Sequence, residues 1–216
     1  MKLYKRWFFP DNEQHFINYF KNLNCDHYQK KQRDSSVKHL KSKMTAIDIG
    51  ANVGLWAVDL CKIFNQVLLF EPCKSNIECL RQNLTNYSNF KIYDCALSNR
   101  EGYSSLYIDN QGSGNHSLVP NKNSQSSIER VKLKKLDNFN FNDIDYIKID
   151  AQFHELEIIE GSINTLKNNN PVLCIEACQR NENEKAYVKK FVHILESLNF
   201  IVVGGLGKEL FFSKKI

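Results

Sequence analysis

The fold is decided by residues 45–54, TAIDIGANVG. The apolar run at 45–49 predicts a buried strand. The glycines at 50 and 54 permit a sharp turn from this strand into a helix, and they let a ligand approach the backbone closely. The helix that follows presents free N–H groups and a partial positive charge at its N-terminus, which suit a carboxylate. This unit predicts a ligand site at the carboxyl end of the first strand.

Outward from this stretch, short apolar runs alternate with amphipathic segments, which is typical of a parallel sheet covered on both faces. Near the C-terminus, runs at 200–203 and 210–213 flank a Gly-Gly-Leu-Gly turn, which predicts an antiparallel hairpin. We therefore expect an α/β, Rossmann-like fold with a mostly parallel seven-stranded sheet, a terminal antiparallel hairpin and helices on both faces. The other expected strands are Val67–Phe70, Lys91–Ala96, Tyr146–Ile149 and Val172–Ile175.

Residues 1–43 form an N-terminal helical lead-in, and residues 44–216 form the main domain. In the lead-in, Asp11 and Gln14 resemble a capping box, and Phe16, Phe20 and Leu23 follow at helical spacing. The polar, basic stretch at 30–43 predicts a solvated helix or linker. The alternative is a patch that steers an anionic substrate.

Residues 102–136 interrupt the alternation and predict a β-rich insertion. Its polar loop at 110–117 is rich in Asn, Ser and Gly. Such a loop either folds over a substrate as a lid or is an ordinary exposed loop, and the two interpretations stay open. His116 within it is a second candidate base.

Composition sets further limits. The net charge of +5, from 29 basic and 24 acidic residues, permits an acidic partner without requiring one, so a nucleic-acid partner is disfavoured but not excluded. The seven cysteines form no Cys-x-x-Cys pair, and several lie in buried-looking segments: Cys61, Cys79, Cys95 and Cys174. This pattern predicts free thiols in a reduced, cytoplasmic compartment. No apolar stretch approaches the roughly 18 residues that span a bilayer, so no membrane partner is expected.

The residue types around the glycine loop favour S-adenosylmethionine (SAM) as the cofactor. SAM carries a carboxylate, which the helix N-terminus suits, and an ammonium group that Asp48 could neutralise. A dinucleotide-binding loop would need Gly-x-Gly-x-x-Gly, but Asn52 breaks that triplet. A nicotinamide or flavin cofactor and a purely structural turn are the alternatives. The cofactor residues expected from this loop are Asp48, Gly50, Asn52 and Gly54.

Two further strand ends extend the cofactor prediction. Glu71 ends the second strand about 20 residues past the glycine loop, where an acid can accept hydrogen bonds from both ribose hydroxyls. A solvated strand-end acid is the alternative. Asp94 and Ala96 close the third strand, where an adenine ring would lie if the cofactor crosses the strand ends.

These motifs together resemble the FkbM-type methyltransferases. The matching stretches are 47–54, Phe70-Glu71-Pro72, 96–99 with Gly102, 146–150, and Glu155-Leu156-Glu157 with Gly161. The resemblance implies a class I, SAM-dependent O-methyltransferase that acts on hydroxyls of sugars, polyketides or other small molecules. Where that family usually has glycine, this chain has Phe153, which predicts a ring beside the reaction centre.

The strand ending at Asp150 is expected to emerge beside the cofactor's methyl group, so Asp150 is the first candidate for orienting the acceptor. His154 and Glu155 follow within one helical turn, and His154 suits a general base at neutral pH. Helix capping or a surface role is the alternative for each of them. Glu176 ends the neighbouring strand, and with Asp150 it could hold Mg²⁺ or another divalent ion.

The sequence therefore predicts a SAM-dependent methyltransferase acting on a hydroxylated small molecule such as a sugar. The alternatives are a methyltransferase acting on nucleic acid and a non-catalytic SAM-binding protein, the second suggested by Phe153.

Overall fold

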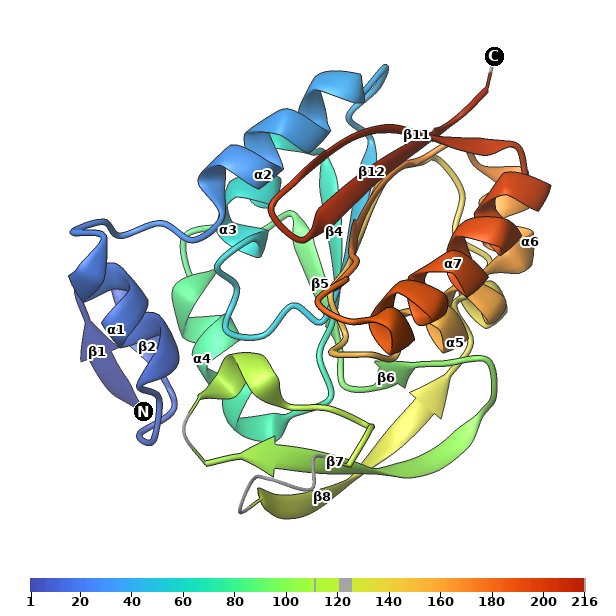
Figure 1. Ribbon diagram of the computed structural model, residues 1–216. Coiled ribbons are helices and arrows are strands. Elements are labelled where there is room, and N and C mark those ends of the chain that lie inside the picture. Colours follow the sequence, from blue (N-terminus) through green and yellow to red (C-terminus); the bar gives the residue numbers. More distant parts are fainter. Residues whose placement is uncertain (111, 121–125, 216) are drawn as a thin grey trace.

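The computed structural model describes residues 1–110, 112–120 and 126–215. Its central sheet has seven strands in the order β11-β12-β10-β9-β3-β4-β5 (Figure 1). Of these described strands only β12 runs antiparallel to its neighbours, so the mostly parallel sheet and the terminal hairpin are confirmed. In sheet order the strands are Phe200–Leu206, Glu209–Lys214, Val172–Glu176, Ile144–Ile149, Thr45–Ile49, Gln66–Phe70 and Phe90–Tyr93.

Helices cover both faces of this sheet, as the sequence predicts (Figure 1). Strand β3 is buried along its whole length, and its side chains alternate between two cores. Ala46 packs into the core beneath α3 and α4, while Ile47 and Ile49 pack into the core beneath α5, α6 and α7. These helices are Ala57–Ile63, Lys74–Asn83, Glu155–Glu160, Ile163–Asn168 and Glu182–Ser197.

The order of strands creates a switch point beside β3. The chain continues from β3 to β4 and β5 on one side, then returns to β9 on the other side. Connections that leave neighbouring strands in opposite directions open a crevice at their carboxyl ends, and ligands of open α/β sheets bind there. The glycine loop follows β3, so the topology places it at this crevice.

The insertion forms a second sheet of three strands, β6 (Ala96–Leu97), β8 (Ser126–Lys134) and β7 (Gly102–Asp109). The predicted β-rich insertion is thus confirmed. The single strand predicted at 91–96 is wrong, because β5 ends at Tyr93 and the Cys95 amide turns back to donate to the Tyr93 carbonyl oxygen at 3.0 Å.

The lead-in begins with a hairpin that the sequence analysis missed, β1 (Lys2–Tyr4) and β2 (Trp7–Phe9). Three-residue strands are too short to show an alternating pattern. The helix α1 (His15–Asn22) follows, and Phe16 and Phe20 are buried as their spacing predicts. The capping box is wrong: Gln14 makes no side-chain cap, and Glu13 Oε1 accepts from the Phe16 amide at 2.8 Å instead.

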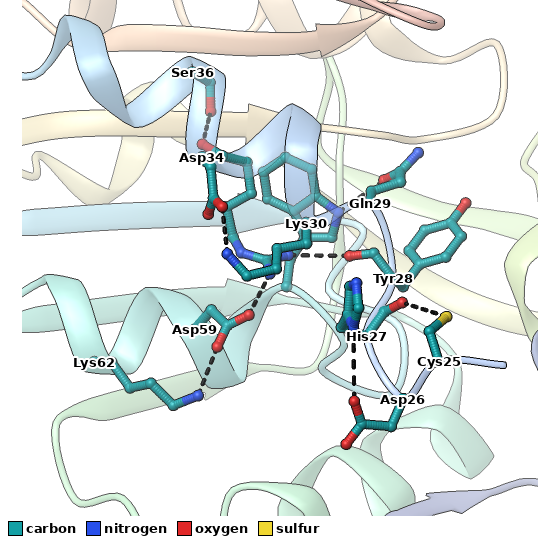
Figure 2. A network of polar contacts seen from close by, with 12 residues as sticks. Cys25, Asp26, His27, Tyr28, Gln29, Lys30, Asp34, Ser36, Asp59 and Lys62 are labelled. Carbon is teal, nitrogen blue, oxygen red and sulfur yellow. Dashed lines mark hydrogen bonds and ion pairs between the residues drawn. The ribbon is translucent and has the colours of Figure 1, made fainter. Parts of the chain in front are cut away.

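The basic stretch after α1 packs into the domain through one buried arginine on α2 (Lys30–Ser36). Arg33 is 1% exposed, pairs with Asp59 on α3 and lies over the Trp56 ring at 5.4 Å. Figure 2 shows Asp59 beside Lys62, with Lys30 and Asp34 paired nearby. The prediction of a solvated segment is therefore wrong at Arg33, which is buried. It is confirmed for the lysines around Arg33, which are exposed.

Two smaller predictions can also be compared with the structure. All seven cysteines are free, and Cys61, Cys79, Cys95 and Cys174 are buried, as predicted. None of the helices in the described residues is long and apolar enough to cross a bilayer.

Candidate active site

A cavity of about 430 Å³ lies at the switch point, a volume within the usual range for small-molecule sites. Its walls come from the glycine loop, the ends of β4, β9 and β10, the start of β6, the lead-in, the insertion and the turn of the terminal hairpin. The residues that line it include Tyr28, Gln29, Gly50, Asn52, Glu71, Ala96, His116, Lys148, Asp150, Gln152, His154, Glu176, Lys208 and Glu209.

Close backbone contact explains the glycine at position 50. Gly50 has φ +77°, and a Cβ there would lie 2.0 Å from the Asp150 carbonyl oxygen. The Gly50 amide also donates to the Phe70 carbonyl oxygen at 3.0 Å. The loop is therefore held between the ends of β4 and β9. Gly54 has a different role: it lies outside the cavity lining, and a Cβ there would lie 2.7 Å from Leu80 on α4.

Glu71 lies beside this loop. Its carboxyl group accepts from the Asn52 amide at 2.8 Å and from the Cys73 amide at 2.9 Å. Burial raises its pKa to about 7. The structure thus brings Glu71, Asn52 and Ala96 to one cavity. Asp94 is exposed and is not among the described residues that line it.

A buried lysine that the sequence analysis missed connects the glycine loop with the end of β9. The Lys148 ammonium lies 3.0 Å from Asp48 Oδ1 and 3.9 Å from Asp150 Oδ2. Burial alone would lower its pKa, but the two carboxylates raise the pKa above its ordinary value. Asp48 is fully buried and lies outside the cavity lining. The structure therefore pairs Asp48 with Lys148, where the sequence predicted direct neutralisation of a cofactor ammonium group.

Asp150 and Glu176 come together at the ends of neighbouring strands, as predicted. The side-chain Nε2 of Gln152 donates to both, at 3.1 Å to Asp150 Oδ1 and at 3.2 Å to Glu176 Oε2. Burial and the nearby Asp150 raise the pKa of Glu176 to about 8. Among residues 1–110, 112–120 and 126–215, no three His, Cys, Asp or Glu side chains form a group that could hold a metal ion. Mg²⁺ at the two carboxylates stays a prediction.

His154 and Glu155 differ in placement. His154 lines the cavity, its Nε2 lies 3.0 Å from Ser98 Oγ, and burial lowers its pKa so that the ring is neutral at pH 7. Glu155 is buried outside that lining, and its Oε1 accepts from the Ala151 amide at 2.9 Å. Glu155 therefore holds the turn after Asp150 in place rather than facing the cavity.

Phe153 points away from the cavity. Its ring lies 6.3 Å from the Tyr187 ring and 5.9 Å from the Arg180 guanidinium, and it is outside the cavity lining. The predicted ring beside the reaction centre is therefore not what the structure shows. The backbone explains the family glycine, because Phe153 has φ +71° and Gln152 has φ +50°.

Replacing Phe153 tests this placement. Phe153→Gly and Phe153→Ala both lose the ring, but only glycine relieves the positive φ, so the glycine variant should be more stable than the alanine variant by about 1 kcal/mol. Because the ring does not line the cavity, methyl transfer should change less than about 3-fold in either variant. Chemical denaturation and initial rates measure the two effects. A rate loss beyond 10-fold in both variants would contradict the outward orientation.

The insertion and the lead-in meet over the cavity. Glu13, fully buried, accepts from the Ser113 amide and hydroxyl at 2.6 Å each. His116 lines the cavity, and its Nδ1 accepts from the Asp109 amide at 3.1 Å. Residues 113–117 thus line the cavity, and whether they act as a lid stays a prediction, while Gln111 of the predicted loop lies outside the described residues.

Several cavity residues come from segments that the sequence analysis did not connect with the site. Tyr28 and Gln29 come from the lead-in, and Lys208 and Glu209 come from the terminal hairpin. Lys148 carried a usable signal, since a charged residue inside a buried strand needs a buried partner. The other four residues carried none, because their contacts span up to 180 residues of sequence.

Three buried carboxyl groups make stability depend on pH. The pKa of Glu71 and of Glu155 is raised by burial to about 7, and that of Glu176 to about 8, so the folded protein holds protons that the unfolded chain has released. This contribution is complete below about pH 4.5 and is lost as pH rises through 7 to 8. We expect the free energy of unfolding to fall by about 3 kcal/mol from pH 6.5 to 8. Urea denaturation at several pH values measures this change. Glu176→Gln should make the free energy of unfolding depend less steeply on pH. A free energy of unfolding that rises over this range would contradict the raised pKa values.

Comparison with known proteins gives a family and a fold. The model of the methyltransferase FkbM domain matches residues 48–202. No curated protein matches the chain. An FkbM methyltransferase from Methylobacillus flagellatus KT has a TM-score of 0.59 at 16% identity, over 82% of this chain and 47% of its own. The chain thus spans about half the length of that protein.

Two further solved structures share the fold. A candidate methyltransferase from Streptococcus mutans, in complex with SAH, has a TM-score of 0.55 at 14% identity, over 88% of this chain and 99% of its own. A ribosomal protein L11 methylase from Lactobacillus delbrueckii subsp. bulgaricus has a TM-score of 0.54 at 12% identity, over 89% of this chain and 81% of its own. At these identities the likeness is one of fold.

Proposed function

The chain belongs to the methyltransferase FkbM domain family, and we propose that it transfers a methyl group from SAM to a hydroxyl of a sugar or another small metabolite. One observation carries this proposal: a single cavity joins the glycine loop and Glu71 on one side to the Asp150 carboxylate on the other. That arrangement supports a cofactor position and an acceptor position that share one cavity.

The residues present fit SAM. Glu71 and Ala96 both line the cavity, where Glu71 would accept hydrogen bonds from ribose hydroxyls and Ala96 would contact an adenine ring. Lys148 contacts both Asp48 and the Gly50 carbonyl oxygen, and so it stabilises the glycine loop from the side of the sheet. When bound, SAM supplies a methyl group that is already activated on a sulfonium, so the protein mainly positions the acceptor and its proton.

Asp150 is the residue we assign to the acceptor hydroxyl. Its carboxylate lines the cavity, is fixed by Gln152 and lies near the Lys148 ammonium. A carboxylate so placed can accept the hydrogen bond of the hydroxyl and aim its oxygen. His154, neutral at pH 7, is a second proton acceptor on the same wall. Glu155 acts as a positioning residue through Ala151.

Asp150→Asn tests the assignment. The amide keeps the shape but not the charge, so methyl transfer should fall about 100- to 1000-fold while the affinity for SAH changes little. Transfer is measured as SAH release on a panel of sugars, small hydroxylated metabolites and oligonucleotides, with and without EDTA. Asp11→Asn, at an exposed carboxylate, is the matched control. Full activity of Asp150→Asn would contradict the role.

The same panel separates the alternatives. Methylation of oligonucleotides alone would replace the small-molecule acceptor with nucleic acid. Tight SAH binding with no methylation of any acceptor would favour a non-catalytic SAM-binding protein. Loss of transfer with EDTA, restored by Mg²⁺, would support the predicted metal, and unchanged transfer would contradict it.

A further inference from the structure

Three carboxyl groups form a row along the carboxyl edge of the sheet. Asp150 follows Ile149, which pairs with Ile175, and the next residue, Glu176, pairs directly with Glu209 across β10 and β12. All three line the acceptor side of the cavity. Side chains of directly paired residues lie on the same face, and like charges there destabilise a sheet. The fold therefore holds an unfavourable arrangement at the place where an acceptor would bind.

Glu209 is the member of this row that has an unpaired carboxyl oxygen in the described part of the chain. It is 5% exposed, and its Oε1 accepts from Gln29 Nε2 at 2.6 Å. Gln29 is itself oriented by the Trp56 indole N–H, which donates to it at 2.8 Å. Glu209 Oε2 is buried and has no hydrogen-bond partner in the part of the chain that the structure describes. A buried carboxyl oxygen left unpaired is costly, so a ligand that donates to it would be stabilised.

Neighbouring cations compensate this row only in part. Lys208 lies 3.6 Å from Glu176, but its side chain is 57% exposed, so water screens the pair. The Lys148 ammonium makes its closest contact with Asp48. Burial, and then the charge of Asp150, raise the pKa of both Glu176 and Glu209. Raised pKa values are expected for carboxyl groups that lack a nearby positive charge.

We propose that the acceptor carries a protonated amino group close to the hydroxyl that is methylated, as an amino sugar or an aminocyclitol does, and that Glu176 and Glu209 bind it. The ammonium donates to the free Oε2 of Glu209 and supplies the missing positive charge between the two strands. Asp150 on the adjacent strand then faces the hydroxyl. This inference rests on the proposed function, because it places the acceptor beside the SAM position.

Isothermal titration calorimetry of the SAH-saturated protein tests the proposal with matched probes. Glucosamine and 2-deoxystreptamine carry amines, while N-acetylglucosamine and glucose carry none that is charged. We expect at least one amine probe to bind 10-fold or more tightly than the neutral probes. Glu209→Gln should reduce that ratio to about 2-fold or less and leave SAH binding unchanged. Glu182→Gln removes one exposed charge that does not line the cavity, and it should keep the ratio.

The outcomes are distinguishable. Absence of heat on SAH addition contradicts the proposed function itself. If SAH binds but neutral and amine probes bind alike, or no amine probe binds at all, the amine inference is overturned. An amine preference that survives in Glu209→Gln also overturns it, because the preference would then arise from the general charge of the surface.

Discussion

Gly50→Ala is expected to lower the free energy of unfolding by about 4 kcal/mol and to abolish SAH binding. The added Cβ would lie 2.0 Å from the Asp150 carbonyl oxygen, a backbone atom that cannot move aside without displacing β9. The positive φ of +77° adds strain for any side chain. Denaturant unfolding and calorimetry with SAH measure the two losses.

Gly102→Ala is the matched control. Its φ of +126° is also unfavourable for alanine, but no atom lies within 4 Å of the added Cβ. This substitution should lower the free energy of unfolding by only about 1–2 kcal/mol, and the variant should bind SAH normally. Equal losses in the two variants would show that backbone strain, and not the close approach to β9, explains position 50.

Lys148→Met is expected to lower the free energy of unfolding by about 3–5 kcal/mol. Lys148 is 5% exposed and Asp48 is fully buried, so the substitution leaves Asp48 as an uncompensated buried charge. The glycine loop also loses the contact from Lys148 Nζ to the Gly50 carbonyl oxygen at 3.4 Å. We therefore expect weaker SAH binding as well, measured by calorimetry at a temperature where the variant is folded.

Two comparisons isolate the buried pair. Lys62→Met breaks the ion pair with Asp59, but the Lys62 side chain is 49% exposed, so it should cost less than about 1 kcal/mol. In the double variant, Asp48→Asn with Lys148→Met, the stranded charge is gone and part of the stability should return. A double variant as unstable as the sum of the single ones would contradict the coupling.

Much of the fold could be predicted because burial leaves a clear pattern in the sequence. Strand β3 is buried on both faces and reads as an apolar run, and the glycines after it meet a steric requirement of the backbone. The hairpin of β1 and β2 and the end of β5 at Tyr93 were missed, because three- and four-residue strands show too little periodicity.

The site was predictable only where strand ends define it. Glu71 and Asp150 follow strands directly and Glu176 is the last residue of its strand, so topology alone brings them to one cavity. The side chains of Asp48 and Glu155 point toward buried partners, and the spacing of residues in the sequence does not reveal those partners. Lead-in and hairpin residues such as Gln29 and Glu209 meet only through tertiary packing.

The most direct test of the account is calorimetric titration of SAH into the wild-type protein and into Glu71→Ala. We expect saturable one-to-one binding to the wild type and an affinity about 10- to 100-fold weaker in the variant, since hydrogen bonds to the Glu71 carboxylate would be lost. No heat of binding in the wild type, or equal affinity in both proteins, would contradict the central claim that this cavity holds the cofactor.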